Sequence, residues 1–256
     1  MLLAIDIGNT ITTLGVFEGD NLRHTWNIAT EVNRTEDEYA VMILNLLRNR
    51  GLDESVIKEV TMCSVVPPLQ ATFEKLFRRY FGRAPLVVEA GIKTGVRIHA
   101  DNPKEVGADR IVNTAAAHRL YGGPAIVVDL GTATTFDVVS KSGDYLGGVI
   151  APGIITAAEA LFLRAAKLPR VELVRPRTVI GTSTVTAMQS GVVFGYVGLV
   201  EGIISRLQQE LGEKAKIIAT GGCAELIAKE TPVIDTVNAD LTLIGLRLVY
   251  LLNKED

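Results

Sequence analysis

The sequence predicts an α/β protein of two duplicated halves, in which each half has a mixed central sheet with flanking helices. Of its 256 residues, 48% are hydrophobic and 21% are charged, as in ordinary globular proteins. Strand patterns alternate with helix patterns along the chain. The opening segment also recurs, because Asp6-Ile7-Gly8-Asn9 aligns with Asp129-Leu130-Gly131-Thr132 at an offset of 123 residues. We therefore expect two domains, at residues 1–122 and 123–256.

The first half is expected to open with three strands. Residues 2–7 and 12–18 surround the turn Gly8-Asn9-Thr10, and residues 21–28 follow a Gly-Asp reversal. A helix begins at Thr35, whose hydroxyl can cap it while Glu38 closes a capping box. The remaining predicted elements are a strand at 60–66, a helix over 69–80 after Pro67-Pro68, and a short strand at 86–88.

The second half repeats this opening with strands at 125–129, 134–139 and 145–150. At the second reversal the offset is 124, which one extra hairpin residue explains. The rest is mostly helical: helices at 154–167, about 184–211, from 224 and 241–251, with strands at 216–219 and 233–235. This layout resembles the actin-like ATPase superfamily, which implies ribonuclease H-like halves with nucleotide bound between them.

Charge and cysteine usage exclude several classes of protein. The net charge is −3 with no long Lys/Arg run, so a nucleic-acid partner is not expected. The two cysteines, Cys63 and Cys223, lie far apart and form no CxxC pair, so they suggest neither a disulfide framework nor a zinc site and fit a reducing compartment. The N-terminal segment does not read as a signal peptide, and charges interrupt every long apolar run. We expect a soluble, cytoplasmic protein with no membrane partner.

The turn after Asp6 is the first candidate site. Its Gly-permitted backbone and the side chains of Asn9, Thr10, Thr12 and Thr13 can approach phosphate oxygens, and Asp6 can hold Mg²⁺ through water. An ordinary hairpin is the alternative. The repeat at Asp129 favours phosphate binding, because an equivalent hairpin would place a second carboxylate and hydroxyl so that they face the first.

The segment Asn102 to Arg110 is the second candidate. Asn102 can cap and Pro103 can begin a helix that runs on through this segment. Asp109 and Arg110 are either a solvated first-turn pair or a base with a cation that neutralises a carboxylate or phosphate. The apolar residues that follow them favour a partly buried position.

Other segments leave two interpretations open. The sequence has no Walker-type or dinucleotide-binding glycine loop, and its three histidines are scattered. Thr220-Gly221-Gly222-Cys223 is either a surface for a purine ring or a plain strand-to-helix turn. Gly191, Gly195, Gly198 and Gly202 indicate close helix approach, within the chain or across a dimer seam.

Together these motifs resemble the type III pantothenate kinase family over nearly the whole chain. They are Asp6-Ile7-Gly8-Asn9-Thr10, Asn102-Pro103, Gly107-Ala108-Asp109-Arg110, Asp129-Leu130-Gly131-Thr132, Gly147-Gly148 with Pro152-Gly153, and Gly181-Thr182-Ser183-Thr184 with Gln189-Ser190-Gly191.

The resemblance implies ATP-dependent phosphorylation of pantothenate to 4′-phosphopantothenate, the first step of coenzyme A synthesis. It implies Asp109 as the catalytic base, Asp129 as a ligand of K⁺ or NH₄⁺, and a homodimer. The implied ATP contacts are Asp6, Ile7, Gly8, Asn9, Thr10, Ile11, Thr12, Thr13 and Thr132. The implied pantothenate contacts are Gly107, Ala108, Asp109, Arg110 and Thr184, with Thr184 at the dimer interface.

The sequence departs from the family pattern at Ala100, where the family usually has Tyr, and at Ala151, where it commonly has Ser. Ala100 cannot donate a phenolic hydrogen bond to pantothenate. Two alternative functions remain open from the sequence: an ATP-binding regulator of the same fold, and a kinase for another small alcohol or acid.

Overall fold

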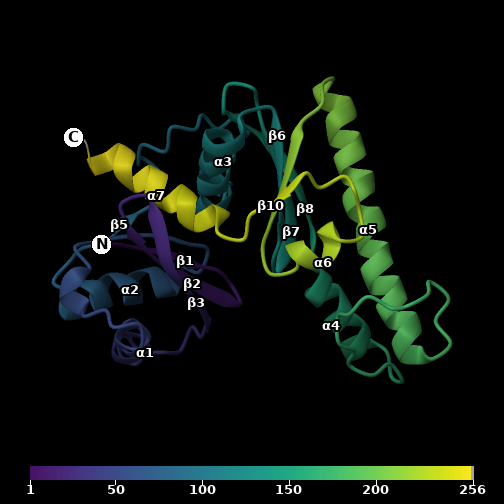
Figure 1. Cartoon of the computed structure of the whole chain (residues 1–256), viewed down its shortest axis with the longest axis horizontal. Coiled ribbons are helices and arrows are strands. Elements are labelled where there is room, and N and C mark those ends of the chain that lie inside the picture. Colours follow the sequence, from purple (N-terminus) through teal and green to yellow (C-terminus); the bar gives the residue numbers. More distant parts are fainter. Residues whose placement is uncertain (255–256) are drawn as a thin grey trace. The chain divides into compact units, whose positions relative to one another are not determined.

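The computed structural model describes residues 1–254, which form two compact units (Figure 1). Unit 1 contains Met1–Val96, Asn102–Ala116 and the C-terminal residues from Thr242. Unit 2 contains Arg97–Asp101 and Ala117–Leu241. This division differs from the expected boundary at residue 122, because the C-terminal helix packs on the first sheet through Leu243, Leu246 and Val249.

The sheet of unit 1 has five strands in the order β3-β2-β1-β4-β5. Strand β1 (Leu2–Ile7) pairs antiparallel with β2 (Ile11–Glu18), which pairs antiparallel with β3 (Asn21–Ala29). On its other edge, β1 pairs parallel with β4 (Glu59–Ser64), which pairs parallel with β5 (Leu86–Val87). The sheet is therefore mixed, as the sequence predicts.

The sheet of unit 2 repeats that topology strand for strand. It contains β6 (Ala125–Leu130), β7 (Ala133–Val139), β8 (Tyr145–Pro152), β9 (Lys216–Thr220) and β10 (Thr236–Val237), in the order β8-β7-β6-β9-β10. Antiparallel and parallel pairs occur at the same places, and the register shifts once between the second and third strands of each unit. The duplicated fold class is confirmed.

The two first hairpins differ by one residue. Asp6 lies opposite Thr13, whereas Asp129 lies opposite Thr135. The turn after Asp129 is therefore one residue shorter than the turn after Asp6. The two carboxylates still occupy equivalent positions, near the carboxyl ends of β6 and β1.

Helices cover both faces of the unit 1 sheet. Alternate residues Leu3, Ile5 and Ile7 pack with α1 (Glu36–Arg48) and α2 (Pro67–Tyr80). The opposite face, with Leu2, Ala4 and Cys63, packs with α7 (Leu241–Lys254) and the start of α3 (Ala108–Tyr121). Because side chains alternate along a strand, Asp6 lies on this second face, under the helix that carries Asp109.

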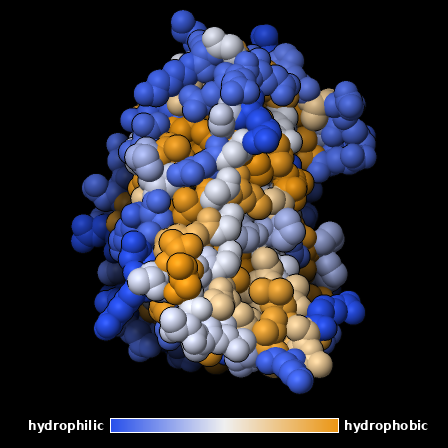
Figure 2. Space-filling model, turned by 90° about the vertical axis from the view of Figure 1, so that its right-hand side faces the viewer, coloured by the Kyte–Doolittle hydropathy of each residue, from blue (hydrophilic) through white to orange (hydrophobic). Residues whose placement is uncertain are grey.

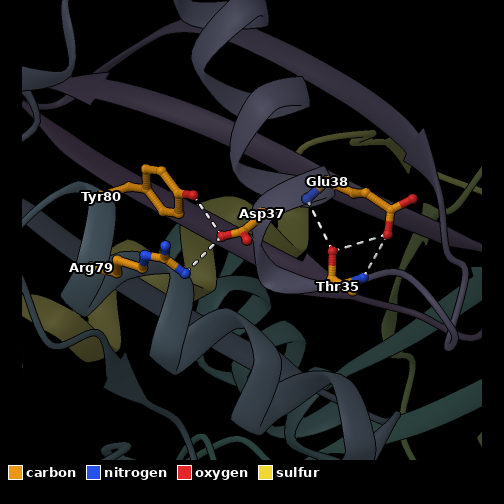
Figure 3. A network of polar contacts seen from close by, with 5 residues as sticks. All are labelled: Thr35, Asp37, Glu38, Arg79 and Tyr80. Carbon is orange, nitrogen blue, oxygen red and sulfur yellow. Dashed lines mark hydrogen bonds and ion pairs between the residues drawn. The ribbon is translucent and has the colours of Figure 1, made fainter.

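Polar contacts hold the start of α1 (Figure 3). Thr35 caps the helix and Glu38 completes the capping box, as predicted. Asp37, also in the first turn, accepts hydrogen bonds from Arg79 and Tyr80 of α2. These contacts join the two helices on the face of the sheet away from Asp6.

In unit 2, one face of the sheet is covered by α4 (Ile154–Arg164), α5 (Thr184–Leu211) and α6 (Ala224–Ala228). Ile126, Val128 and Leu130 point into this core. Among the described residues, α5 is the one helix long and apolar enough to cross a membrane, although charges were expected to interrupt it. Half of that apolar stretch is buried in unit 2, as in the core helix of a soluble protein.

Several predicted elements are corrected. Asn102 caps a 3₁₀ helix (η2, Pro103–Glu105) that stops at the extended Val106, so α3 begins anew at Ala108. The last strand is Thr236–Val237 rather than residues 233–235, because Asp235 precedes the strand and accepts the Ile217 N–H through its carboxylate. The helix predicted to reach residue 167 ends at Arg164.

Candidate functional site

Asp6 occupies the carboxyl end of β1, next to Cys63 of the parallel strand β4. The thiol of Cys63 donates a hydrogen bond to Oδ1 of Asp6 over 3.3 Å. Asp6 is half-buried and Cys63 is fully buried. The carboxylate is therefore held at the end of the strand, where the chain turns into the phosphate-loop candidate.

Asp109 lies in the first turn of α3. Its Oδ1 accepts the backbone N–H of Arg110 at 2.9 Å, so the carboxylate folds back over the start of its own helix. A side chain at Gly107 would overlap this carboxylate, because an ideal Cβ there falls well inside contact distance of Oδ1. The glycine in Gly107-Ala108-Asp109-Arg110 thus has a local steric reason.

The charge of Asp109 perturbs the carboxylate of Asp6. Burial, and then the negative charge of Asp109, raise the pKa of Asp6 to about 7, while the hydrogen bond from Cys63 opposes the rise. Burial also raises the pKa of Asp109, although the N–H and charge of Arg110 lower it. Unit 1 therefore has two neighbouring carboxylates, at Asp6 and Asp109, whose proton affinity is higher than usual, which suits cation binding and proton acceptance.

The turn after Asp6 is built by backbone bonds. The N–H of Gly8 donates to the carbonyl of Ile11 at 3.1 Å, and a Cβ at Gly8 would lie 2.8 Å from that oxygen. Asn9 and Thr10 are exposed at the tip. The hydroxyl of Thr12 is buried against Thr30 at 2.8 Å, and Thr13 donates to Asn27 at 3.0 Å.

Asp129 in unit 2 has a glycine-lined setting. A Cβ at Gly221, whose φ is +89°, would lie 2.5 Å from Oδ1 of Asp129. Gly153 packs against the turn at Gly131-Thr132, and its N–H donates to the carbonyl of Thr132 at 3.1 Å. Thr156 of α4 donates to the same carbonyl at 2.8 Å. Glycine backbone therefore approaches this second hairpin where side chains would not fit.

Thr184 is the first residue of α5, after the cap Ser183. It is exposed and lines an apolar groove of about 710 Å³ between α4 and α5. Other lining residues are Ala157, Leu161, Met188, Gly191, Gly195 and Leu199. The glycines of α5 do not serve close packing within unit 2, because a Cβ at Gly191, Gly195 or Gly198 would meet no atom within 4 Å.

The site residues predicted from the sequence thus fall into separate groups, one in unit 1 and two in unit 2. Unit 1 brings together Asp6, Gly107, Asp109 and the phosphate turn, with Ala108 and Arg110 in the same turn of α3. Unit 2 holds Asp129 and Thr132 at one hairpin and Thr184 at the groove. No group of three or more His, Cys, Asp or Glu side chains among residues 1–254 forms a ready-made metal site.

Sequence reasoning missed the contact of Cys63 with Asp6, because it interpreted Cys63 only as a core residue. The sequence predicts that Cys63 is buried. That it contacts Asp6 follows only from the strand order, in which β4 lies beside β1. The proximity of Gly221 to Asp129 was missed for the same reason, since β9 lies beside β6.

Comparison with known proteins gives a consistent family. The model of the type III pantothenate kinase family matches residues 2–206. A type III pantothenate kinase of Dehalococcoides mccartyi is 55% identical over 253 residues, which cover 99% of this chain and 96% of the relative. Those of Moorella thermoacetica and Geobacillus kaustophilus are 54% and 52% identical, with at least 98% of each chain covered.

Solved structures agree on the fold. The activator of the 2-hydroxyisocaproyl-CoA dehydratase from Clostridium difficile, with bound ADPNP, superposes with a TM-score of 0.59 at 13% identity. The superposition includes the whole of this chain and 97% of the activator's chain. The ethanolamine utilization protein EutJ from Carboxydothermus hydrogenoformans gives a TM-score of 0.56 at 16% identity, with 96% and 89% covered. At these identities the likeness concerns the fold alone.

Proposed function

Since the chain belongs to the type III pantothenate kinase family and is therefore a phosphotransferase that phosphorylates pantothenate in coenzyme A biosynthesis, we propose how its residues divide that reaction. Asp109 is the base, Asp6 serves the divalent metal, and Asp129 serves a monovalent cation. The observation that supports this division best is the pair of carboxylates at Asp6 and Asp109 in unit 1, each with a raised pKa.

Asp6 fits a site for Mg²⁺ held through water. The metal commonly uses one or two protein carboxylates together with nucleotide phosphates. The carboxylate of Asp6 lies at the end of a buried strand. Its pKa is raised by burial and by the charge of Asp109, and a bound cation would stabilise its charged form. When bound, Mg²⁺ offsets the charge that develops on the phosphate oxygens.

Asp109 accepts the proton of the pantothenate hydroxyl. The bond from the Arg110 N–H occupies Oδ1, which leaves Oδ2 for the alcohol. A raised pKa makes Asp109 a better proton acceptor at neutral pH than an exposed aspartate. Arg110, with its planar guanidinium, pairs with the pantothenate carboxylate, and Gly107 and Ala108 give the substrate backbone contacts.

The phosphate turn from Asp6 to Thr13 binds ATP. Because the hydroxyls of Thr12 and Thr13 contact Thr30 and Asn27, we assign direct phosphate contacts to the tip residues Gly8, Asn9 and Thr10. Ile7, Ile11, Thr12 and Thr13 shape the two strands that present the tip. Thr132, on the second hairpin, also contacts ATP.

Asp129 fits a large monovalent cation, K⁺ or NH₄⁺. Gly221 lets the backbone after β9 approach Oδ1 of Asp129 closely, because a Cβ there would lie 2.5 Å from that oxygen. The carbonyl oxygens of Gly131 and Thr132 lie in this hairpin, and carbonyl oxygens suit such cations as ligands. When bound, the cation would supply positive charge that offsets negative charge on phosphate oxygens.

The chain acts as a cytoplasmic homodimer, with Thr184 of one subunit contacting pantothenate of the other. Support comes from the α4–α5 groove, where the small residues Gly191 and Gly195 line an open apolar surface. Figure 2 shows hydrophobic side chains gathered on the side of the molecule that carries α5. The exposed apolar residues of unit 2 include Ile155, Leu161, Phe162, Leu163, Val179, Ile180 and Val185.

A coupled assay of ADP release tests the division of roles. With ATP, Mg²⁺ and K⁺, we expect turnover with pantothenate and none with glycerol, acetate or simple sugars. Replacing K⁺ by Na⁺ should abolish turnover, and Asp129→Ala should remove both activity and the response to K⁺. Equal rates in K⁺, NH₄⁺ and Na⁺ would remove Asp129 from the proposed role.

A further inference from the structure

Cys63 is a buried thiol that contacts a functional carboxylate. It lies directly beside Asp6 in the parallel register of β1 and β4, on the same face of the sheet. Its side chain is 0% exposed, and its Sγ is 3.3 Å from Oδ1 of Asp6. The two residues lie on neighbouring strands of the central sheet. The backbone hydrogen bonds between β1 and β4 therefore fix the distance between their side chains.

The thiol of Cys63 acts as a hydrogen-bond donor to Asp6. An ordinary thiol has a pKa of about 8.5 and is protonated at neutral pH. The group therefore stays protonated, which makes it unreactive as a nucleophile and keeps its S–H available to a carboxylate.

The duplicated half gives an independent parallel. In unit 2, Asp129 is paired in the same register with Thr220 of β9, and Thr220 is 2% exposed. Each half thus places a small buried residue with a hydrogen-bond donor beside its strand-end aspartate. On β1, the other residues of this face, Leu2 and Ala4, are apolar.

We propose that Cys63 is a positioning residue for the kinase reaction, which holds Oδ1 of Asp6 through its S–H so that Oδ2 would be available to a metal-bound water. This inference rests on the proposed role of Asp6. The positioned carboxylate needs no reorientation when the Mg²⁺–nucleotide complex binds, so loss of the thiol donor weakens that complex more than it slows the chemical step.

The test compares side chains with and without a donor. Cys63→Ala and Cys63→Val remove the donor, the second without leaving a cavity, whereas Cys63→Ser keeps it. Thr61→Val is the matched control: Thr61 lies on the same strand and face, fully buried, and its hydroxyl has no hydrogen-bond partner among the described residues. Binding of Mn²⁺·ADP by calorimetry and the KM for Mg·ATP are measured for each variant.

We expect Cys63→Ala and Cys63→Val to weaken Mn²⁺·ADP binding and raise the KM for Mg·ATP by about 3- to 10-fold, the range for one hydrogen bond, with kcat within about twofold. Cys63→Ser should restore wild-type values and Thr61→Val should not change them. A serine variant that behaves like alanine, or donor-free variants that behave like wild type, would overturn the inference.

Two further measurements separate the possible failures. If Asp6→Asn leaves Mn²⁺·ADP binding intact, the proposed role of Asp6 fails; if it weakens binding while the Cys63 variants do not, only this inference fails. The infrared S–H stretch of the wild-type protein is a test that needs no folded Cys63 variant. The Cys63 band should lie below that of Cys223 and move upward in Asp6→Asn, and two coincident bands would overturn the inference.

Discussion

Gly107 lies where a side chain would displace the carboxylate of Asp109, the base we propose. The carboxylate of Asp109 folds back onto the Arg110 N–H through the space that a Cβ at position 107 would fill. The glycine is therefore required for the orientation of Asp109 rather than for an unusual backbone angle, because its φ is not in the left-handed region.

We expect Gly107→Ala to lower kcat by about 10-fold or more, because a small misplacement of a general base has a large kinetic cost. The measurement is a double-mutant cycle with Asp109→Asn. If Gly107 acts through Asp109, the alanine adds little loss once the carboxylate is gone; independent, additive losses would contradict that explanation.

Asp109→Asn should lower kcat by about 10²- to 10⁴-fold, the usual contribution of a positioned base. Thermal stability should be unchanged or slightly higher, because the variant removes a partly desolvated charge. Glu36→Gln, at a partly buried acid in the first turn of α1, is the control and should retain activity. A folded Asp109→Asn enzyme with near-normal turnover would exclude the role.

The raised pKa of Asp6 predicts a pH dependence of stability. Because the folded-state pKa of about 7 exceeds the ordinary 3.8, the folded protein binds this proton more tightly than the unfolded chain does. The stabilisation is complete below about pH 4 and is lost as the pH rises to about 7. In nucleotide- and metal-free protein, Asp6→Asn should flatten this fall and raise the Tm at pH 8 by several degrees. Parallel Tm curves for both proteins would contradict the prediction.

At the scale of elements, each hairpin lies beside the end of a parallel strand, β4 in unit 1 and β9 in unit 2. The hairpin at Asp129 closes against the turn that follows β9, where Gly221 has a φ of +89°. Gly222, the next residue, has open space around it and no left-handed φ. The adjacent glycines therefore have different structural roles.

Gly221→Ala should reduce activity strongly and abolish the activation by K⁺, because its Cβ would lie 2.5 Å from Oδ1 of Asp129 and its backbone would be strained. Gly222→Ala should keep the wild-type response to K⁺. Titration of initial rates with KCl at constant ionic strength measures both. A Gly221→Ala enzyme with a normal K⁺ response would separate Gly221 from the cation site.

At the scale of the whole molecule, the apolar groove between α4 and α5 requires an explanation that unit 2 does not supply. A Cβ at Gly191 or Gly195 would meet no atom within 4 Å, and Thr184 is among the residues that line the groove. A second copy of the chain is the partner we propose.

Light scattering should give about twice the 27.5 kDa chain mass. Leu161→Arg, in the groove, should produce monomers and lower activity, because a charge there cannot be buried against an apolar surface without a large cost. Arg206→Glu, exposed near the other end of α5, is the control and should stay dimeric. A monomeric wild-type protein with full activity at nanomolar concentration would contradict the shared site.

The sequence alone was sufficient for the local features of this protein. The repeat of Asp6 at Asp129, the capping box at Thr35 and the limits of α5 follow from residue spacing and nearby hydrogen bonds, which act over a few residues. Strand limits were predicted to within a few residues, whereas the 3₁₀ turn before Ala108 was not, because the dihedral angles of Val106 override a suitable cap at Asn102.

Only the tertiary structure decided which distant residues became neighbours. Cys63 contacts Asp6 because β4 joins the parallel edge of β1, Gly221 reaches Asp129 because β9 joins β6, and α7 belongs to unit 1 because its apolar face is buried there. Strand order and helix placement depend on burying apolar surface across the whole fold, and spacing along the chain does not contain that information.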